Sequence, residues 1–449
     1  MKRKLLFSAT IVSMLVVFSL NSLSLSGRKP FWLDEAYSLS NNVREYEFKD
    51  IIINGATGQG STSPLDYLIV KTVDKYKSNL KYLHLQPHQY FRVYNLVFLW
   101  LAVGLISFQV FKNQKSNFIR FAFIVALASF LFNSQVAYFA SEMRPYSIWT
   151  SLSFLLLFLL TLPSISQILL TVSIIFLALS TTASIYQITS YVLSLLLLVL
   201  IFNKPKKIFT LPLLTTLLAS YLIIFYYILH LGSPNYPTPP WEYFLQFWID
   251  YVPVIFLGIS LSIYHYLKKD KPNLTASLTG TFWLLFGPLS FFMTQQKGFF
   301  FTPRQYIYYF PVLSLFLYQS IIMIFNKPKK LKKLTLIIFV LSLYLLNLIR
   351  VNTNTAIPQA IKSIFHPYPV SIPVNYSKLE SSIPNQIPSK YELLPKNPES
   401  GFDSIVSLNF QVWWQYLQDK YPESQYPRYN STLVVRDRDI NFELVDVKK

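Results

Sequence analysis

The sequence predicts an all-α polytopic membrane protein of about eleven transmembrane helices, followed by a small extracytoplasmic α/β domain. Of its 449 residues, 52% are hydrophobic and only 14% are charged, and the mean hydropathy is +0.36. Apolar runs of roughly 20 residues, enough to cross a bilayer, recur along the chain. The basic residues fall between these runs, so the net charge of +19 reflects membrane topology, and we expect no nucleic-acid partner.

The apolar runs predict helices at residues 5–25, 93–111, 118–139, 146–162, 167–181, 184–202, 208–231, 246–267, 274–294, 305–325 and 333–350. The first run follows Lys2, Arg3 and Lys4, as in a signal peptide. It is too long for the apolar segment of an ordinary signal peptide, so we expect an uncleaved membrane anchor.

Lysine clusters in alternate connections predict the orientation in the membrane. They comprise Lys2–Lys4 with Arg3, Lys112/Lys115, Lys204/Lys206/Lys207, Lys268/Lys269/Lys271 and Lys327/Lys329/Lys330/Lys332/Lys333. The short connections of the other side hold only three basic residues, Arg144, Lys297 and Arg304. The positive-inside rule therefore puts the N-terminus in the cytoplasm, with loop 26–92 and the tail 351–449 outside. A bacterial plasma (inner) membrane is the expected location.

The tail differs in composition from the transmembrane domain, residues 1–350. It is rich in Pro, Tyr, Asn and Ser, with strand patterns at Ser404–Leu408 and Thr432–Arg436 and a helical pattern around Val412–Asp419. We therefore expect residues 351–449 to form a small extracytoplasmic α/β domain.

Loop 26–92 contains a helix-start signal. Ser63 is a candidate N-cap, Pro64 suits the first helical position and Asp66 favours the first turn. The following apolar residues share one helical face, which predicts an amphipathic helix on the outer membrane surface, packed on the bundle: Leu65, Leu68, Ile69, Val73 and Tyr76.

Several kinds of site are not expected. The chain has no cysteine, which excludes disulfides and thiolate chemistry. Gly55–Thr62 has part of the spacing of a phosphate-binding loop, but Ser61 stands where the lysine belongs. His84 and His88 are separated by Pro87, which argues against a shared helical face and a metal site. We assign no metal-ligating residue and no cofactor-binding motif.

Three stretches that are distant in sequence carry the candidate site residues. The first, F-W-L-D-E-A-Y-S-L (31–39), holds the acid pair Asp34 and Glu35. The second, S-E-M-R-P-Y-S (141–147), holds Glu142, Arg144 and Tyr146, and the third, F-T-P-R-Q-Y-I-Y-Y-F-P (301–311), holds Arg304 and Tyr306. In isolation, a solvated loop, an interfacial ion pair and an aromatic belt explain them equally well. Together they predict an acid pair and two arginines at one outer face, where an arginine fork suits a lipid phosphate.

These motifs resemble those of the GT-C glycosyltransferases. L-D-E-A-Y-S, S-P-L-x-Y-L, E-x-R-P-Y and the late Arg-Tyr-Pro stretch are similar to glycosyltransferase family 39, which includes protein O-mannosyltransferases and the lipid A aminoarabinose transferase. The likeness covers roughly residues 1–350. Thr62–Asp66 reads T-S-P-L-D where the family commonly has H-P-P-L-Y, so no residue here matches that histidine.

The resemblance implies a GT-C-like bundle and inverting sugar transfer from a polyprenyl-phosphate-linked donor to an extracytoplasmic lipid, glycan or protein acceptor. Asp34 would then be the general base, and Glu35 beside it would shape the catalytic site. Glu142, Arg144, Tyr146 and Tyr306 would line the substrate pocket, and Arg304 would hold the lipid phosphate.

Two other functions compete with this one. A transporter or lipid-linked-sugar flippase also needs charged groups in a membrane, but it usually keeps them near the midplane and in repeated halves. Here the charged residues gather at span ends, and no repeat is visible. A non-catalytic scaffold that binds a partner through Trp413 and Trp414 is the third alternative.

Overall fold

The structure, a computed structural model, describes residues 2–28, 46–54, 64–77, 87–114, 116–202, 210–229, 241–297, 308–325, 431–436 and 439–444. It also describes Glu35, Ser38, Leu39, Val43, Tyr82 and Leu85 between these stretches. The predicted helix at 333–350 and the predicted tail elements at 404–408 and 412–419 lie outside the described residues.

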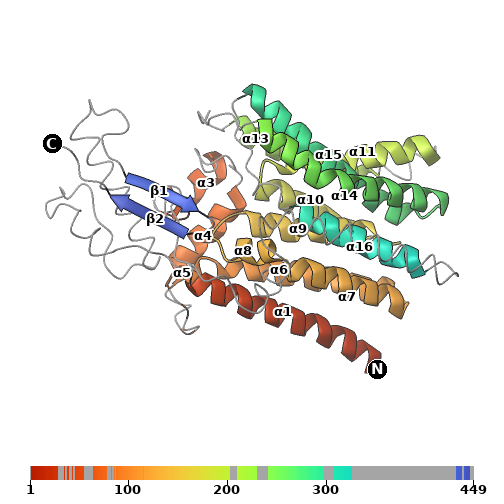
Figure 1. The fold of residues 1–449 in the computed structure, drawn as a ribbon, viewed down its shortest axis with the longest axis horizontal. Helices are drawn as coiled ribbons and strands as arrows, with labels where there is room; N and C mark the ends of the chain where they lie inside the picture. The colour runs from red at the N-terminus through yellow and green to blue at the C-terminus, as the bar shows by residue number, and fades with distance from the viewer. Residues whose placement is uncertain are drawn as a thin grey trace.

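A bundle of helices, most of them 14 residues or longer, forms the body of the described chain (Figure 1). Its members are α1 (Lys2–Arg28), α6 (Val93–Asn113), α7 (Asn117–Leu131), α8 (Ser134–Ala140), α9 (Tyr146–Leu160), α10 (Gln167–Ser180), α11 (Ser184–Phe202), α13 (Leu211–Leu229), α14 (Trp241–Leu267), α15 (Lys271–Lys297) and α16 (Tyr309–Phe325). Each helix predicted between residues 5 and 325 has a counterpart here, with one difference. The stretch 118–139 is two helices, α7 and α8, because the Asn133 side chain accepts hydrogen bonds from the backbone N–H groups of Gln135 and Val136 and starts a new helix.

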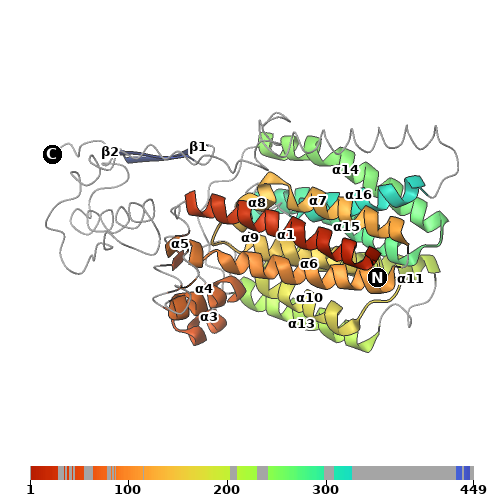
Figure 2. The same ribbon diagram turned by 90° about the horizontal axis from the view of Figure 1, so that it is seen from below.

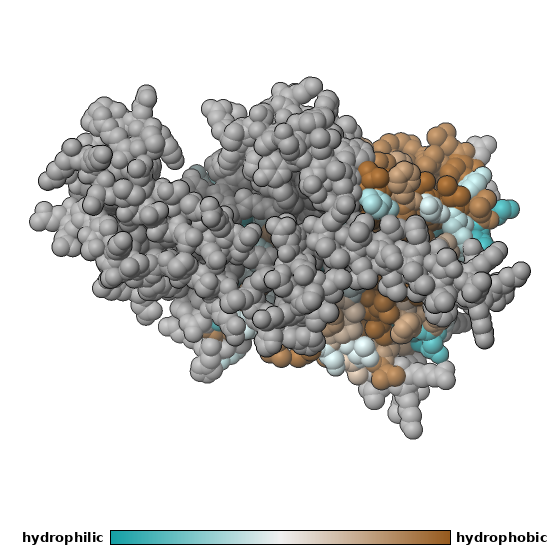
Figure 3. Space-filling view, in the orientation of Figure 1, coloured by the Kyte–Doolittle hydropathy of each residue, from teal (hydrophilic) through white to brown (hydrophobic). Residues whose placement is uncertain are grey.

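Four of the described helices are long and apolar enough to cross a membrane: 6–26, 93–113, 184–202 and 211–229. Leucines on α11 and α13 point outward, and Leu200 and Leu211 are more than 70% exposed. Figure 3 shows such hydrophobic side chains in brown on the flank of the bundle. This is the architecture of a helical membrane protein, whose outer surface is apolar.

Helix α9 is the centre of the bundle, since every one of its residues is buried. Its polar contacts run through Gln187 of α11. The Trp149 indole N–H donates to the Gln187 side-chain oxygen, and the Gln187 amide donates to Ser153 over 2.8 Å. The Trp283 indole of α15 donates to the Gln187 carbonyl oxygen over 3.0 Å, so three helices share one satisfied polar cluster.

The two ends of the bundle differ. The Phe7 ring of α1 lies 5.9 Å from the Phe111 ring at the end of α6, so the N-terminus and the Lys112 connection share one end, here called the N-terminal end. The turn from α14 to α15 lies at the same end (Figure 1). The short helices α3 (Phe48–Asn54), α4 (Pro64–Tyr76) and α5 (Pro87–Tyr90) gather at the opposite end, here called the α4 end (Figures 1 and 2).

Helix α4 confirms the helix predicted from Pro64, but a different face is buried most deeply. Leu65, Leu68, Ile69 and Val73 are half-buried against the core, and Tyr76 is exposed. The deepest side chains are Asp66, Tyr67 and Val70. The expected apolar stripe therefore lies at the edge of the contact between α4 and the bundle, because Asp66 and Tyr67 face the bundle.

The C-terminal tail contributes one described unit, an antiparallel hairpin. Strands β1 (Ser431–Arg436) and β2 (Asp439–Leu444) pair in the register Ser431 to Leu444. Strand β1 covers the stretch 432–436, where the sequence predicts a strand. The rest of the expected tail domain stays a prediction.

Candidate functional site

A buried ion pair anchors the first of the three candidate stretches. The Arg92 guanidinium, just before α6, donates from Nη2 to Glu35 Oε2 over 2.7 Å and from Nε to Glu35 Oε1 over 3.1 Å. Its Nη1 donates to the Ser26 carbonyl oxygen in the last turn of α1 over 3.0 Å. Both side chains are almost fully buried, so this is a two-pronged, charge-assisted contact that ties loop 26–92 to two helices.

The same carboxylate holds the second stretch. The backbone N–H of Met143 donates to Glu35 Oε1, and Asn95 of α6 donates to the carbonyl oxygen of Glu142. Every residue from 141 to 150 is buried. The turn between α8 and α9 is therefore fixed from two sides, by the first loop and by α6, although the two sequence stretches are about a hundred residues apart.

Arg144 lies in this turn, among aromatic and acidic groups. Its guanidinium carbon is 5.8 Å from the centre of the Tyr146 ring, within the range of a cation–π contact. Arg144 is only 7% exposed, and its charge acts on Asp66 and Tyr67 of α4. An arginine held in such a dry setting interacts strongly with anions, because little water screens it.

Asp66 is the acid on the α4 side of this cluster. Its side chain is buried, and the Tyr94 hydroxyl of α6 donates a hydrogen bond to Oδ1. Burial raises the pKa of Asp66 to about 6, and the nearby Glu35 charge adds to the rise, while the Tyr94 hydrogen bond and Arg144 oppose it. Burial likewise raises the pKa of Tyr67, whose hydroxyl therefore stays protonated at neutral pH. A buried acid that titrates near neutral pH is a common feature of functional sites.

The described end of the third stretch reaches the same region. The buried Tyr308 ring lies 5.5 Å from the Trp149 ring in the first turns of α9 and 6.4 Å from the Trp283 ring of α15. Trp149 is three residues after Tyr146, about one helical turn. The chain just after the predicted phosphate ligand Arg304 therefore packs beside the helix that begins at Tyr146.

The predicted residues divide into two groups. Glu35, Glu142, Arg144 and Tyr146 are buried at the α4 end, and contacts of Glu35 and Asn95 join their stretches. Asp34, Arg304 and Tyr306 lie outside the described residues.

Sequence reasoning missed Arg92 and gave Asp66 only the role of a helix-start acid. For Arg92 the available signal was a cation directly before an apolar span, next to the loop that carries the acid pair. For Asp66 it was a carboxylate directly before a tyrosine on a helix with a strong apolar stripe.

Comparisons of the chain with protein-family models, with curated proteins and with solved structures found no match.

Replacing Asp66 with Asn is expected to flatten the dependence of stability on pH. The folded-state pKa of about 6 lies above the ordinary value of 3.8, so the folded state binds more protons between these values. The contribution of Asp66 to stability is therefore largest below about pH 4 and is lost as the pH rises through 6, about 3 kcal/mol in total. The amide keeps an acceptor for Tyr94 and does not titrate, so the variant should be the more stable protein at pH 7.

Thermal unfolding of the detergent-solubilised protein across pH 4–8 measures this. Asp74→Asn is the matched control on the same helix, because Asp74 makes a partly exposed pair with Lys77 at 3.1 Å. An Asp66→Asn variant with the pH profile of the parent protein would show that Asp66 does not titrate in this window.

Proposed function

We propose that the chain is an integral membrane glycosyltransferase that moves a sugar, with inversion, from a polyprenyl-phosphate-linked donor to an acceptor outside the cytoplasm. The observation that carries the proposal is the contact of Glu35 with Arg92 and Met143. This contact joins the loop that bears the acid pair to the turn that bears Arg144. A transferase site needs both of these, a carboxylate as general base and a cation for the anionic leaving group. The resemblance to GT-C family 39 motifs supports the same reading.

The residues suit the chemistry of a lipid-phosphate donor. Its leaving group is a phosphate, already a stable anion, so the site needs fixed cations more than a proton donor. Arg144, and Arg304 in the third stretch, are the arginines for this role. The acceptor hydroxyl needs a base on the opposite face of the sugar, and Asp34 is the proposed base.

In this proposal Glu35 is a positioning residue. Its two oxygens are engaged by Arg92 and by the Met143 backbone, so the carboxylate is committed to holding the loop. Asp34 is bonded to Glu35, and consecutive Cα atoms are about 3.8 Å apart. Anchoring Glu35 therefore limits how far the proposed base can be from the Arg144 turn.

The placement of the site supports a membrane-borne substrate. The cluster lies where α6 and α9 begin, at the α4 end of the bundle, while the exposed lysines Lys112, Lys268, Lys269 and Lys271 lie at the N-terminal end. By the positive-inside rule, we propose that the α4 end is the extracytoplasmic one, in a bacterial inner membrane. A lipid-linked donor reaches such a site laterally, within the leaflet.

Arg144→Ala should weaken donor affinity by roughly ten- to a hundredfold, because a charge-assisted hydrogen bond to a phosphate contributes about 1.5–3 kcal/mol. Titration of the purified protein with a polyprenyl-phosphate sugar measures it. Arg120→Ala is the matched control: Arg120 lies on α7, donates to the Phe111 carbonyl oxygen over 3.1 Å and is remote from the site. Equal donor affinity in the Arg144 and Arg120 variants would remove Arg144 from the phosphate site.

A further inference from the structure

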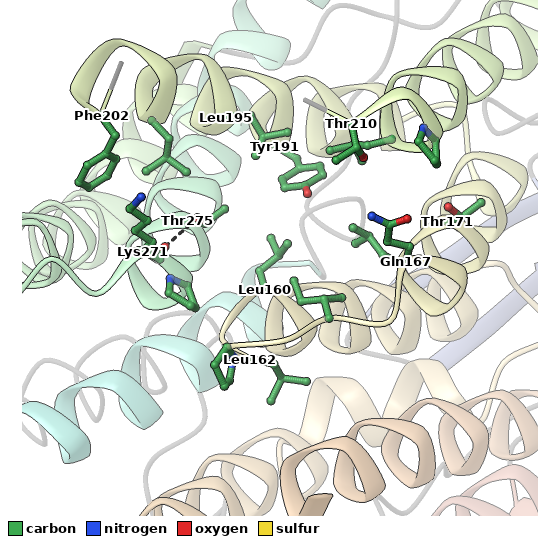
Figure 4. Close-up of a pocket in the computed structure, with 17 residues that line it drawn as sticks. Leu160, Leu162, Gln167, Thr171, Tyr191, Leu195, Phe202, Thr210, Lys271 and Thr275 are labelled. Carbon is green, nitrogen blue, oxygen red and sulfur yellow. Dashed lines mark hydrogen bonds between the residues drawn. The ribbon is translucent and has the colours of Figure 1, made fainter. Parts of the chain in front are cut away.

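A cavity of about 360 Å³ lies near the N-terminal end of the bundle, away from the proposed transferase site (Figure 4). Five helix ends surround it. The end of α9 and the start of α10 form one side, and the last turns of α11 with the starts of α13 and α15 form the other.

The lining of the cavity is mainly aliphatic: Leu160, Leu162, Leu170, Leu195, Leu198 and Leu213. Polar residues also line the cavity: Gln167, Thr171, Tyr191, Thr210, Lys271 and Thr275. The Tyr191 hydroxyl and the Gln167 amide point into the space (Figure 4). Thr171 is hydrogen-bonded to Thr216 over 3.0 Å, so its hydroxyl adds little polarity. The aliphatic part of this lining suits a hydrocarbon chain.

The side chain of Lys271 lies at one end of the cavity. The Lys271 Nζ lies 4.5 Å from the centre of the Phe202 ring, and Lys271 is exposed, as are Lys268 and Lys269 in the preceding turn. The neighbouring acid, Asp270, is engaged by Asn273 Nδ2 over 2.8 Å and by His265 Nδ1 over 3.3 Å. Among the residues that the structure describes, none forms an ion pair with Lys271. The cavity thus pairs an apolar interior with a positive end.

The surroundings of the cavity are apolar as well. Ile168 of α10, Leu200 of α11 and Leu211 of α13 belong to the helices that form its walls, and each is at least 74% exposed. On α11 the buried Leu195 and Leu198 line the cavity, while Leu200 faces outward. The cavity therefore lies between helices whose outer faces suit contact with lipid.

We propose that this cavity binds an acyl chain of an anionic phospholipid of the leaflet at the N-terminal end, with the lipid phosphate at Lys271. Burial of methylene groups among the leucines provides affinity, and the lysine selects a net negative headgroup. The site is separate from the transferase site and does not depend on the proposed activity.

Native mass spectrometry of the full chain in detergent tests this, with dioleoyl phosphatidylglycerol and dioleoyl phosphatidylcholine as probes. The parent protein should bind the anionic lipid more tightly. Leu195→Trp, which fills the cavity, should weaken binding of both lipids at least roughly tenfold, because two excluded methylene groups already account for about that factor. Leu218→Trp is the control, since Leu218 is 61% exposed on α13 and does not line the cavity.

Lys271→Gln tests the headgroup contact without filling the space. It should lower the preference for phosphatidylglycerol over phosphatidylcholine roughly fivefold, whereas Lys112→Gln, an exposed lysine at the same end, should leave it unchanged. Inorganic phosphate at millimolar concentration should not displace the lipid. Equal binding by the Leu195→Trp and Leu218→Trp variants would overturn the proposal, and so would a parent protein without headgroup preference or displacement by phosphate alone.

Discussion

Asp34→Asn is expected to reduce sugar transfer by a factor of about 10² to 10⁴, the usual contribution of a general base. The amide has nearly the shape of the carboxylate but cannot accept the proton of the acceptor hydroxyl. In the proposed function the donor phosphate is held by arginines and not by Asp34, so the dissociation constant of the polyprenyl-phosphate sugar should change little. The measurements are turnover of a radiolabelled donor and a donor titration on the same purified variant.

The matched control is Asp50→Asn. Asp50 is an acid of the same loop, in α3, and accepts a hydrogen bond from the Glu47 backbone N–H over 3.1 Å. The control variant should transfer sugar at the rate of the parent protein. If Asp34→Asn also turned over normally, Asp34 would have no part in the chemistry, whatever the remaining residues do.

Breaking the Glu35–Arg92 pair should have the largest effect on stability. Glu35→Gln removes the negative charge that faces the buried Arg92 guanidinium. Arg92→Met removes the positive charge that faces the buried Glu35 carboxylate. Each single change is expected to lower the free energy of unfolding by about 3–5 kcal/mol. The double variant removes both charges of this pair, so it should lose clearly less than the sum of the single changes.

Thermal unfolding in detergent compares the four proteins of this cycle. Neutralising Asp74 and Lys77, whose ion pair is partly exposed, should cost at most about 1 kcal/mol. If Glu35 positions the loop that carries Asp34, the double variant should transfer sugar slowly even though its loss of stability is smaller than the sum of the single losses. Additive losses in stability would mean that the two side chains do not act as a pair.

The apolar runs of the sequence predicted the described helices well, because stretches such as 93–111 and 184–202 are mostly apolar and about as long as a membrane span. It missed the break at Asn133. An asparagine inside an apolar run does not reveal whether its side chain caps a new helix, since that depends on the local backbone geometry.

The meeting of the first two candidate stretches was predicted from their common side of the membrane, and the Glu35–Met143 contact confirms that they lie together. The partner of Glu35 was not predictable in the same way. Arg92 lies 57 residues from Glu35 in the chain, and a basic residue before a span is ordinarily explained by membrane topology.

The buried position of Asp66 was also beyond pattern reasoning. The apolar stripe of α4 favoured Leu65, Leu68 and Val73 as the contact face, but a hydrogen bond to Tyr94 and the Arg144 charge make it possible to bury an acid instead. Such an arrangement depends on Tyr94 of α6 and on Arg144 in the turn before α9, which a local helical pattern does not encode.

Transfer and transbilayer movement, measured side by side, test the central claim most directly. The purified chain is reconstituted in vesicles with a radiolabelled polyprenyl-phosphate sugar and a panel of lipid, glycan and peptide acceptors. The proposed function predicts sugar on an acceptor and free polyprenyl phosphate in equal amounts. Movement of the intact donor between leaflets, with no transfer to any acceptor, would contradict it and identify the chain as a flippase.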